Sequence, residues 1–303
     1  SDRYASRPDA LLLTVQADGT PLTPQPSISW LKNEDIWTYT IAGLPRYQAG
    51  TTVPIRYTVV ETTPADYIAT SASVSGKADV DTGNVTDADF INTLSTVSIS
   101  GSKTWVDDSD AYGMRPDSIE LTVYADGDAM ATQPDVNWSQ TGNMWQYSIA
   151  GLPKYQSGTS TQITYQIYET PASGYVPDTL STSGTVDSDG NITDADFTNT
   201  LATVSISGAK TWDDQLNQYD TRPDDITLTV LADDVELVPQ PTIAWKKSGA
   251  VWNYSIANLP RYQFGTDTPI VYSVKETAVA GYLPETDTIA SGHVDSDGNV
   301  TEA

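Results

Sequence analysis

The chain has 303 residues, enough for two or three domains, and it contains no apolar run of the roughly 20 residues that a membrane-spanning helix needs. Its 40 acidic and 15 basic residues give a net charge of -25, which argues against nucleic-acid and membrane partners and favours a monomer. The absence of cysteine excludes disulfides and thiolate chemistry, and the one histidine, His293, falls at an ordinary strand position, so most metal and acid–base chemistry is excluded too.

Internal repetition is the strongest feature of the sequence. The stretch from Ser98 to Asp107, which contains Gly101-Ser-Lys103-Thr-Trp105, recurs from Ser205 to Asp214, an offset of 107 residues. An Arg-Pro-Asp triplet that begins at Arg7 recurs at Arg115 and Arg222. The sequence therefore predicts three copies of one domain.

In chain order, the first repeat covers residues 1–95 and lacks its first strand, because Ser1 falls after the position of a Lys-Thr-Trp. The second repeat, residues 96–202, is complete, and the third, residues 203–303, lacks its last strand. Each consists of short segments rich in Val, Ile, Thr, Tyr and Trp that are separated by Pro and Gly, with no helical period. We expect an all-β fold of immunoglobulin-like antiparallel sandwiches, which short connections stack into an elongated rod.

Three polar residues of the second repeat interrupt apolar strand faces. Lys103 shares its parity with Val97, Ile99 and Trp105, and alternate residues of a strand point to the same side. By the same argument Glu169 and Asn199 point inward from their strands. The end repeats keep part of this set: Glu61 and Asn92 in the first, Lys210 and Glu276 in the third.

Two interpretations fit such a buried set. One is a structural Lys–Glu ion pair with an asparagine as its third member. The other is chemical: desolvation disfavours the charged forms of both groups, so a neutral lysine amine could attack the asparagine Cγ while the protonated glutamic acid polarises the amide carbonyl and transfers protons. That reaction would release ammonia and leave an intramolecular isopeptide bond.

The motifs resemble those of the B-type repeat of Gram-positive collagen adhesins, the Cna B-type domain. They are the Gly-x-Lys-Thr-Trp strand, the Arg-Pro-Asp that follows, the run from Trp145 to Tyr155, the Tyr-x-Ile/Val-x-Glu strand and the closing Asn-Thr, and together they span the whole chain. The resemblance implies a Lys103–Asn199 isopeptide bond with Glu169 as the catalytic residue. It assigns the same catalytic role to Glu276 and Glu61, with Lys210 lacking its asparagine and Asn92 lacking its lysine.

The expected function is a structural stalk of a bacterial adhesin, outside the cell and anchored to a Gram-positive cell wall. Its partners would be neighbouring domains of a longer protein and, through a head domain, a host matrix protein or glycan. The alternative is that the repeats themselves bind a ligand or form a pilus-like subunit, since repetition also supplies multivalency. A turnover enzyme is not expected, because the reactive set would be consumed once.

An acidic segment from Asp187 to Asp196 is the one candidate for a cofactor. Asp187, Asp189 and Asn191 resemble the start of a calcium loop, but the glycine stands at position four where an EF-hand has it at six, and no helices flank the segment. An acidic hairpin turn is the preferred interpretation. We expect no cofactor, with calcium as the alternative.

Overall fold

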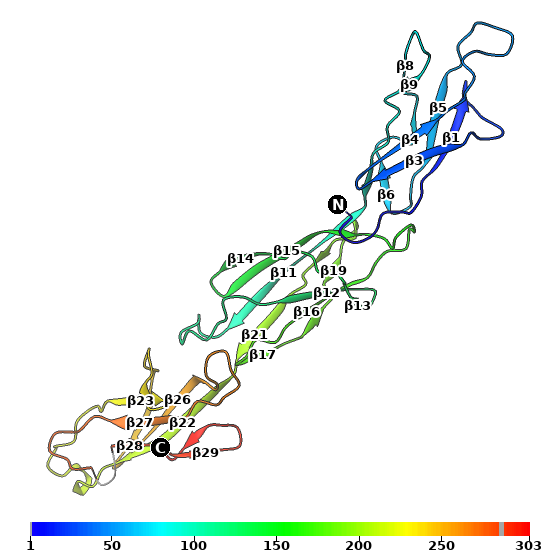
Figure 1. Ribbon diagram of the computed structural model, residues 1–303. Coiled ribbons are helices and arrows are strands. Elements are labelled where there is room, and N and C mark those ends of the chain that lie inside the picture. Colours follow the sequence, from blue (N-terminus) through cyan, green and yellow to red (C-terminus); the bar gives the residue numbers. More distant parts are fainter. Residues whose placement is uncertain (1, 285–287) are drawn as a thin grey trace.

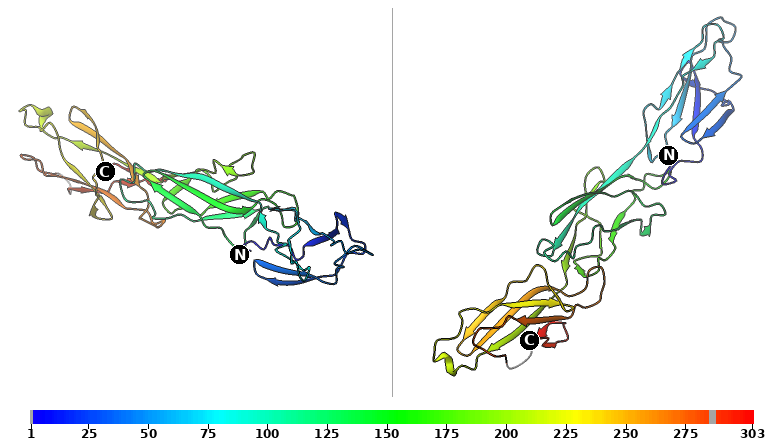
Figure 2. Two further views of the ribbon diagram at one scale, coloured as in Figure 1. Left: turned by 90° about the horizontal axis from the view of Figure 1, so that it is seen from above. Right: turned by 60° about the vertical axis from the view of Figure 1, so that its left-hand side comes forward.

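Short β-strands joined by turns make up nearly all the regular structure in the computed structural model, which describes residues 2–284 and 288–303. Among these residues the exception is a 3-10 turn, η1 (Gln215–Asn217), and no helix is long and apolar enough to cross a membrane. Three groups of strands follow one another along an elongated molecule (Figure 1), and the turned views of Figure 2 show the same end-to-end order. The all-β expectation is confirmed.

The second repeat forms two sheets that enclose one core. The larger sheet contains β14 (Asn137–Thr141), β15 (Met144–Pro153), β11 (Thr96–Val106), β20 (Ile192–Thr193) and β19 (Thr185–Val186), together with β21 (Phe197–Leu201) and β17 (Tyr175–Pro177). The smaller sheet contains β13 (Asp128–Ala129), β12 (Leu121–Ala125), β16 (Tyr165–Glu169) and β18 (Ser181–Thr182). Inward residues of both sheets, such as Ile99 and Ile167, are fully buried. Their burial follows from the period-two alternation of apolar residues along each strand.

The strand β11 is the centre of this repeat. It pairs antiparallel with β15 and parallel with β21, placing Lys103 opposite Phe197 and Trp105 opposite Asn199. Because residues two apart on a strand share a face, Lys103 and Asn199 are diagonal neighbours on the inner side of the sheet. The first and last strands of the repeat thus lie side by side although 96 residues separate these two positions.

The third repeat follows the same plan. Its larger sheet contains β25 (Ala244–Ser248), β26 (Val251–Pro260), β22 (Thr203–Thr211), β30 (Val300–Thr301) and β29 (His293–Val294). Its smaller sheet contains β24 (Val235–Glu236), β23 (Leu228–Ala232), β27 (Tyr272–Glu276) and β28 (Ile289–Ala290). His293 is exposed in β29, opposite Thr301. No described strand pairs with β22 in the way that β21 pairs with β11.

The first repeat is the most open of the three. One sheet contains β2 (Thr20–Pro21), β1 (Leu12–Ala17), β5 (Tyr57–Thr62) and β7 (Ser73–Val74). The other strands form three separate pairs: β3 (Ile28–Asn33) with β4 (Ile36–Ile41), β6 (Tyr67–Ala69) with β10 (Asn92–Leu94), and β8 (Lys77–Ala78) with β9 (Val85–Thr86). A cleft of about 1410 Å³ runs between them, lined by Trp37, Glu61 and Asn92 among others. Trp37 corresponds to Trp145, which pairs with Lys103 of β11 in the second repeat. The cleft therefore occupies the position that β11 fills there.

Candidate functional site

Lys103, Glu169 and Asn199 meet in the core of the second repeat, on β11, β16 and β21. Lys103 and Asn199 are 0% exposed and Glu169 is 3% exposed. Strand alternation sends all three inward, beside Trp105, whose ring centre is 4.9 Å from Lys103 Nζ. Such burial of three polar groups is tolerable only when they satisfy one another.

The Glu169 carboxylate joins the other two residues. Lys103 Nζ donates to Glu169 Oε1 at 2.7 Å and to Oε2 at 2.8 Å, and Asn199 Nδ2 donates to Oε1 at 2.7 Å. Asn199 Oδ1 is buried and has no hydrogen-bond partner among the described residues. The glutamate therefore lies in direct contact with both the amine and the amide that the proposed reaction would join.

The amide orientation differs from the expectation that Glu169 faces the carbonyl of Asn199. The amide nitrogen faces Glu169 instead. An ionised carboxylate only accepts hydrogen bonds, so it binds the NH₂ group, whereas a protonated glutamic acid could donate to Oδ1. In this arrangement the carboxylate accepts hydrogen bonds from both Lys103 Nζ and Asn199 Nδ2.

Burial is the dominant influence on the lysine. Desolvation lowers the pKa of Lys103, and the opposing hydrogen bond and charge of Glu169 do not fully restore it. Proton transfer from Lys103 to Glu169 would leave both groups neutral, which a solvent-free core favours. The neutral, nucleophilic form of the Lys103 amine is therefore easier to reach here than it is in water.

The end repeats each hold two members of the set. In the third repeat Lys210 Nζ donates to Glu276 Oε2 at 2.9 Å, and both side chains are 21% exposed. In the first repeat Asn92 Nδ2 donates to Glu61 Oε1 at 2.8 Å. The exposure of the Lys210 pair reflects the lack of a described strand at the position of β21.

The first half of the acidic segment, residues 187–191, forms the tight turn between β19 and β20. Asp187 Oδ1 accepts from the N–H groups of Asp189 and Asn191, at 2.8 Å and 2.9 Å, and Asn191 Oδ1 accepts from Ser98 N at 2.9 Å. These oxygens are therefore engaged in holding the turn against β11. Nowhere in residues 2–284 and 288–303 do three or more acidic or histidine side chains gather as a metal site would require.

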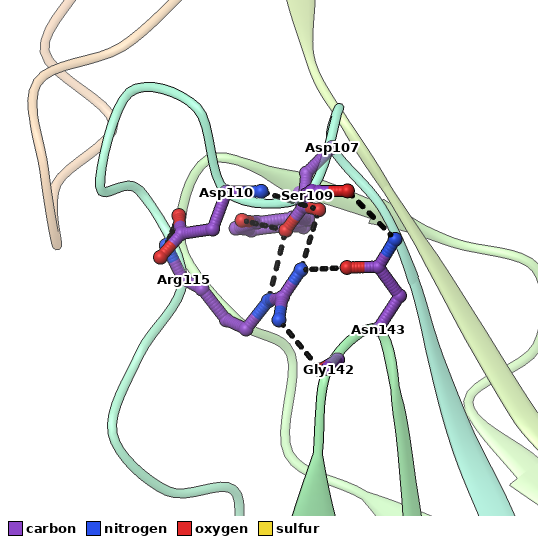
Figure 3. A network of polar contacts seen from close by, with 7 residues as sticks. Asp107, Ser109, Asp110, Arg115, Gly142 and Asn143 are labelled. Carbon is purple, nitrogen blue, oxygen red and sulfur yellow. Dashed lines mark hydrogen bonds and ion pairs between the residues drawn. The ribbon is translucent and has the colours of Figure 1, made fainter.

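A second buried network was not identified from the sequence (Figure 3). Arg115 Nη2 and Nε donate to the two oxygens of Asp107 at 2.6 Å and 3.0 Å, Nη1 donates to Gly142 O at 2.8 Å, and Tyr175 Oη donates to Asp107 Oδ2 at 2.9 Å. Asp214, Arg222 and Tyr282 repeat this arrangement in the third repeat. The recurring Arg-Pro-Asp was its sequence signal, but only the fold brings Tyr175 to Asp107.

The tryptophans contribute to cores. Trp105, Trp145, Trp212 and Trp252 are buried, and Trp105 packs edge-on against Trp145 at 5.3 Å between ring centres. Trp212 and Trp252 repeat this contact at 5.2 Å. These four rings therefore provide no surface platform for a ligand.

Comparison with known proteins identifies the family of the repeats. The family model of the Cna protein B-type domain matches residues 1–86, 99–195 and 206–300. A collagen adhesin of Staphylococcus aureus is 30% identical over 283 residues, which are 92% of this chain and 21% of that protein. The chain thus spans a small part of the length of that relative.

Solved structures include similar chains. Two B repeat units (B1B2) of the collagen binding protein of Staphylococcus aureus are 22% identical, with 99% of this chain and 69% of that chain covered and a TM-score of 0.31. The TIE protein of Bacillus anthracis is 14% identical, with 96% and 47% covered and a TM-score of 0.39. Since the family model matches three successive ranges that make up most of the sequence, this chain belongs to the Cna B-type domain family.

Proposed function

We propose that this chain is a stalk segment of a bacterial surface adhesin, in which an autocatalytic isopeptide bond between Lys103 and Asn199 stabilises the second repeat. The chain divides into repeats at residues 1–95, 96–202 and 203–303. The observation that carries the proposal is the contact of one buried carboxylate, Glu169, with both Lys103 Nζ and Asn199 Nδ2. Membership of a family that includes a collagen adhesin supports the adhesin context.

The proposed reaction uses only these three side chains. Lys103 passes a proton to Glu169, and the neutral Nζ attacks Asn199 Cγ. Glu169 gives this proton to Nδ2, which it already contacts, and takes a second proton from Nζ as the Nζ–Cγ bond forms and the Cγ–Nδ2 bond breaks. Ammonia leaves, and Glu169 keeps the second proton until it passes it to the ammonia or to solvent. One amine and one amide thus become one secondary amide and one ammonia, with no oxidant or cofactor required.

The bond would join the first strand of the repeat to the last. In the chain-entropy model a cross-link that closes about 100 residues stabilises a fold by about 4.7 kcal/mol, by analogy with a disulfide. Because β11 and β21 lie side by side, tension that enters through one would leave through the other. The intervening strands would then carry no load, which suits a stalk.

The end repeats are not expected to close this bond within the chain. The third offers Lys210 and Glu276, and the first offers Glu61 and Asn92, each without the missing reactant among the described residues. The complete set of the second repeat would be consumed in a single turnover, so the chain is not proposed as an enzyme. We place the protein outside the cell on a Gram-positive cell wall, with neighbouring domains as its partners and host ligands bound by a head domain.

Intact-mass spectrometry tests the cross-link. We expect the purified chain to weigh less than its sequence by one ammonia molecule, and proteolytic digestion to release a branched peptide that contains Lys103 and Asn199. Glu169→Ala should restore the full sequence mass, because no other described carboxylate contacts both reactants.

The matched control is Glu276→Ala, which removes the equivalent glutamate of the third repeat and should leave the loss of one ammonia intact. A parent chain at its full sequence mass would refute the cross-link in the second repeat. A loss of more than one ammonia would show that an end repeat finds its missing reactant in another chain.

A further inference from the structure

The loop after β11 carries a tyrosine toward the next repeat. We call residues 107–115 the knob loop, with Tyr112 near its tip. Asp108, Ser109 and Asp110 adopt positive φ in succession, and the Asp107–Arg115 pair closes the loop at its base. Arg115 N also donates to Asp110 Oδ1 at 2.9 Å (Figure 3). The loop is therefore held in one shape by its own repeat.

Tyr112 packs in two hydrophobic clusters at once. It contacts the cluster of its own repeat that contains Trp105, Met114 and Tyr175, and it packs against the core of the third repeat, which contains Tyr272. Burial raises the pKa of Tyr112, with a smaller contribution from the charge of Asp108. One side chain thus joins two domains.

The first junction has the same construction. Tyr4, which corresponds to Tyr112, packs against the core of the second repeat. The neighbouring Arg3 donates to Asp135 Oδ2 at 2.6 Å and to Gln133 O at 2.7 Å. Two successive junctions therefore place the same aromatic residue on the equivalent face of the next repeat.

The chain connection provides a second point of attachment at each junction. Lys154 N donates to Ser95 O at 2.9 Å in the first junction, and Arg261 N donates to Ala202 O at 2.9 Å in the second. A single covalent connection allows one domain to swing and rotate about it. The packing of Tyr4 or Tyr112, which lies away from this connection, restricts that motion and fixes the angle between neighbouring repeats.

We propose that the knob-loop tyrosine is a docking residue that seats in the edge of the next repeat and sets the stiffness of the rod. The partner that it fits is another repeat of this same kind, since Tyr4 and Tyr112 both occupy such a site. Tyr219 is the corresponding residue of the third repeat, and it is 71% exposed. Because its side chain is exposed, Tyr219 provides a matched control within this chain.

Distances between spin labels test the proposal, because the cysteine-free sequence allows cysteines to be introduced one pair at a time. Leu31, Ser139 and Lys246 are equivalent exposed positions on the three repeats. Double electron–electron resonance on the full chain, labelled at residues 139 and 246, should give a single narrow distance distribution. In Tyr112→Ala that peak should be lost to a broad distribution, whereas Tyr219→Ala should match the parent.

Two further variants separate docking from folding. Tyr112→Phe keeps the ring, and the described residues provide no hydrogen-bond partner for the hydroxyl group, so it should retain the narrow peak. Tyr4→Ala lies outside the second repeat and should broaden the 31–139 distribution while leaving the 139–246 distribution unchanged. A narrow parent-like peak in both Tyr112→Ala and Tyr4→Ala would overturn the proposal and assign the rigidity to the chain connection.

Discussion

At the scale of single residues, the second repeat contains two buried ion pairs with different roles. Lys103 and Glu169 lie against the amide that they are proposed to modify, whereas Asp107 and Arg115 hold a loop. Burial raises the pKa of Asp107, but hydrogen bonds from Arg115, Tyr175 and the N–H of Asp110 outweigh it and hold that pKa below its ordinary value. Asp107 is therefore an ionised structural anchor.

Removal of this anchor should be costly. Asp107→Ala leaves the largely buried Arg115 guanidinium without its carboxylate, and breaking a buried pair from one side destabilises a domain by about 3 kcal/mol. Denaturant unfolding followed by tryptophan fluorescence measures this loss. Asp128→Ala, at an exposed position in β13, is the control and should change the free energy of unfolding little. Equal effects of the two substitutions would show that the network contributes nothing to stability.

At the scale of elements, the parallel pairing of β11 with β21 decides how the second repeat responds to force. The two strands belong to opposite ends of the repeat in sequence but are neighbours in the sheet. Hydrogen bonds alone would let them separate under load. The proposed bond between Lys103 and Asn199 would make that separation impossible without breaking a covalent bond.

Single-molecule stretching should show this difference directly. In the parent chain the second repeat should not lengthen. In Glu169→Ala it should unfold and release on the order of 300 Å, at roughly 3.3 Å for each residue between the two strands. Glu276→Ala, which affects the third repeat, should leave the second inextensible. The end repeats, which are not expected to close the bond, can extend in both chains, so Glu169→Ala should show one more unfolding step than the parent. An equal number of steps in the two chains would contradict the load path proposed here.

At the scale of the whole molecule, acidic residues set the net charge, and some of them also hold turns and loops. The net charge of -25 favours repulsion between parts of the chain, yet particular aspartates stabilise the fold. Asp187 and Asp295 hold equivalent turns by accepting side-chain and backbone hydrogen bonds from Asn191 and Asn299, which lower their pKa values. The pKa of Asp214 is lowered mainly by its hydrogen bond from Arg222.

These shifts predict acid sensitivity. A carboxylate with a lowered pKa in the folded state contributes stability that is complete above the unfolded pKa of about 3.9 and is lost as the pH falls through the folded pKa. The unfolding temperature should therefore hold or rise as the pH falls toward about 4, because repulsion is relieved, and should drop below that pH. Calorimetry from neutral to strongly acidic pH measures this profile. An unfolding temperature that kept rising through the acid range would show that charge repulsion outweighs these anchors.

Most of the fold was accessible from the sequence because its signals are local. Period-two alternation predicts strands and their buried faces, and the same parity places Lys103, Glu169 and Asn199 on the inner faces of their strands. The recurrence of Lys103 at Lys210, with its strand, identified the repeats. The residues of a strand alone are enough to show which of its two faces is apolar.

Contacts between distant segments were decided by the tertiary structure alone. The sequence could not show that the amide nitrogen of Asn199, and not its carbonyl, faces Glu169, because that orientation depends on which groups the two sheets bring together. It also did not reveal that Tyr175 completes the Asp107 network, or that Tyr112 seats in the following repeat. These contacts depend on how sheets, loops and successive domains pack against one another. Strand periodicity shows which face of a strand is buried, but not which distant residues that face contacts.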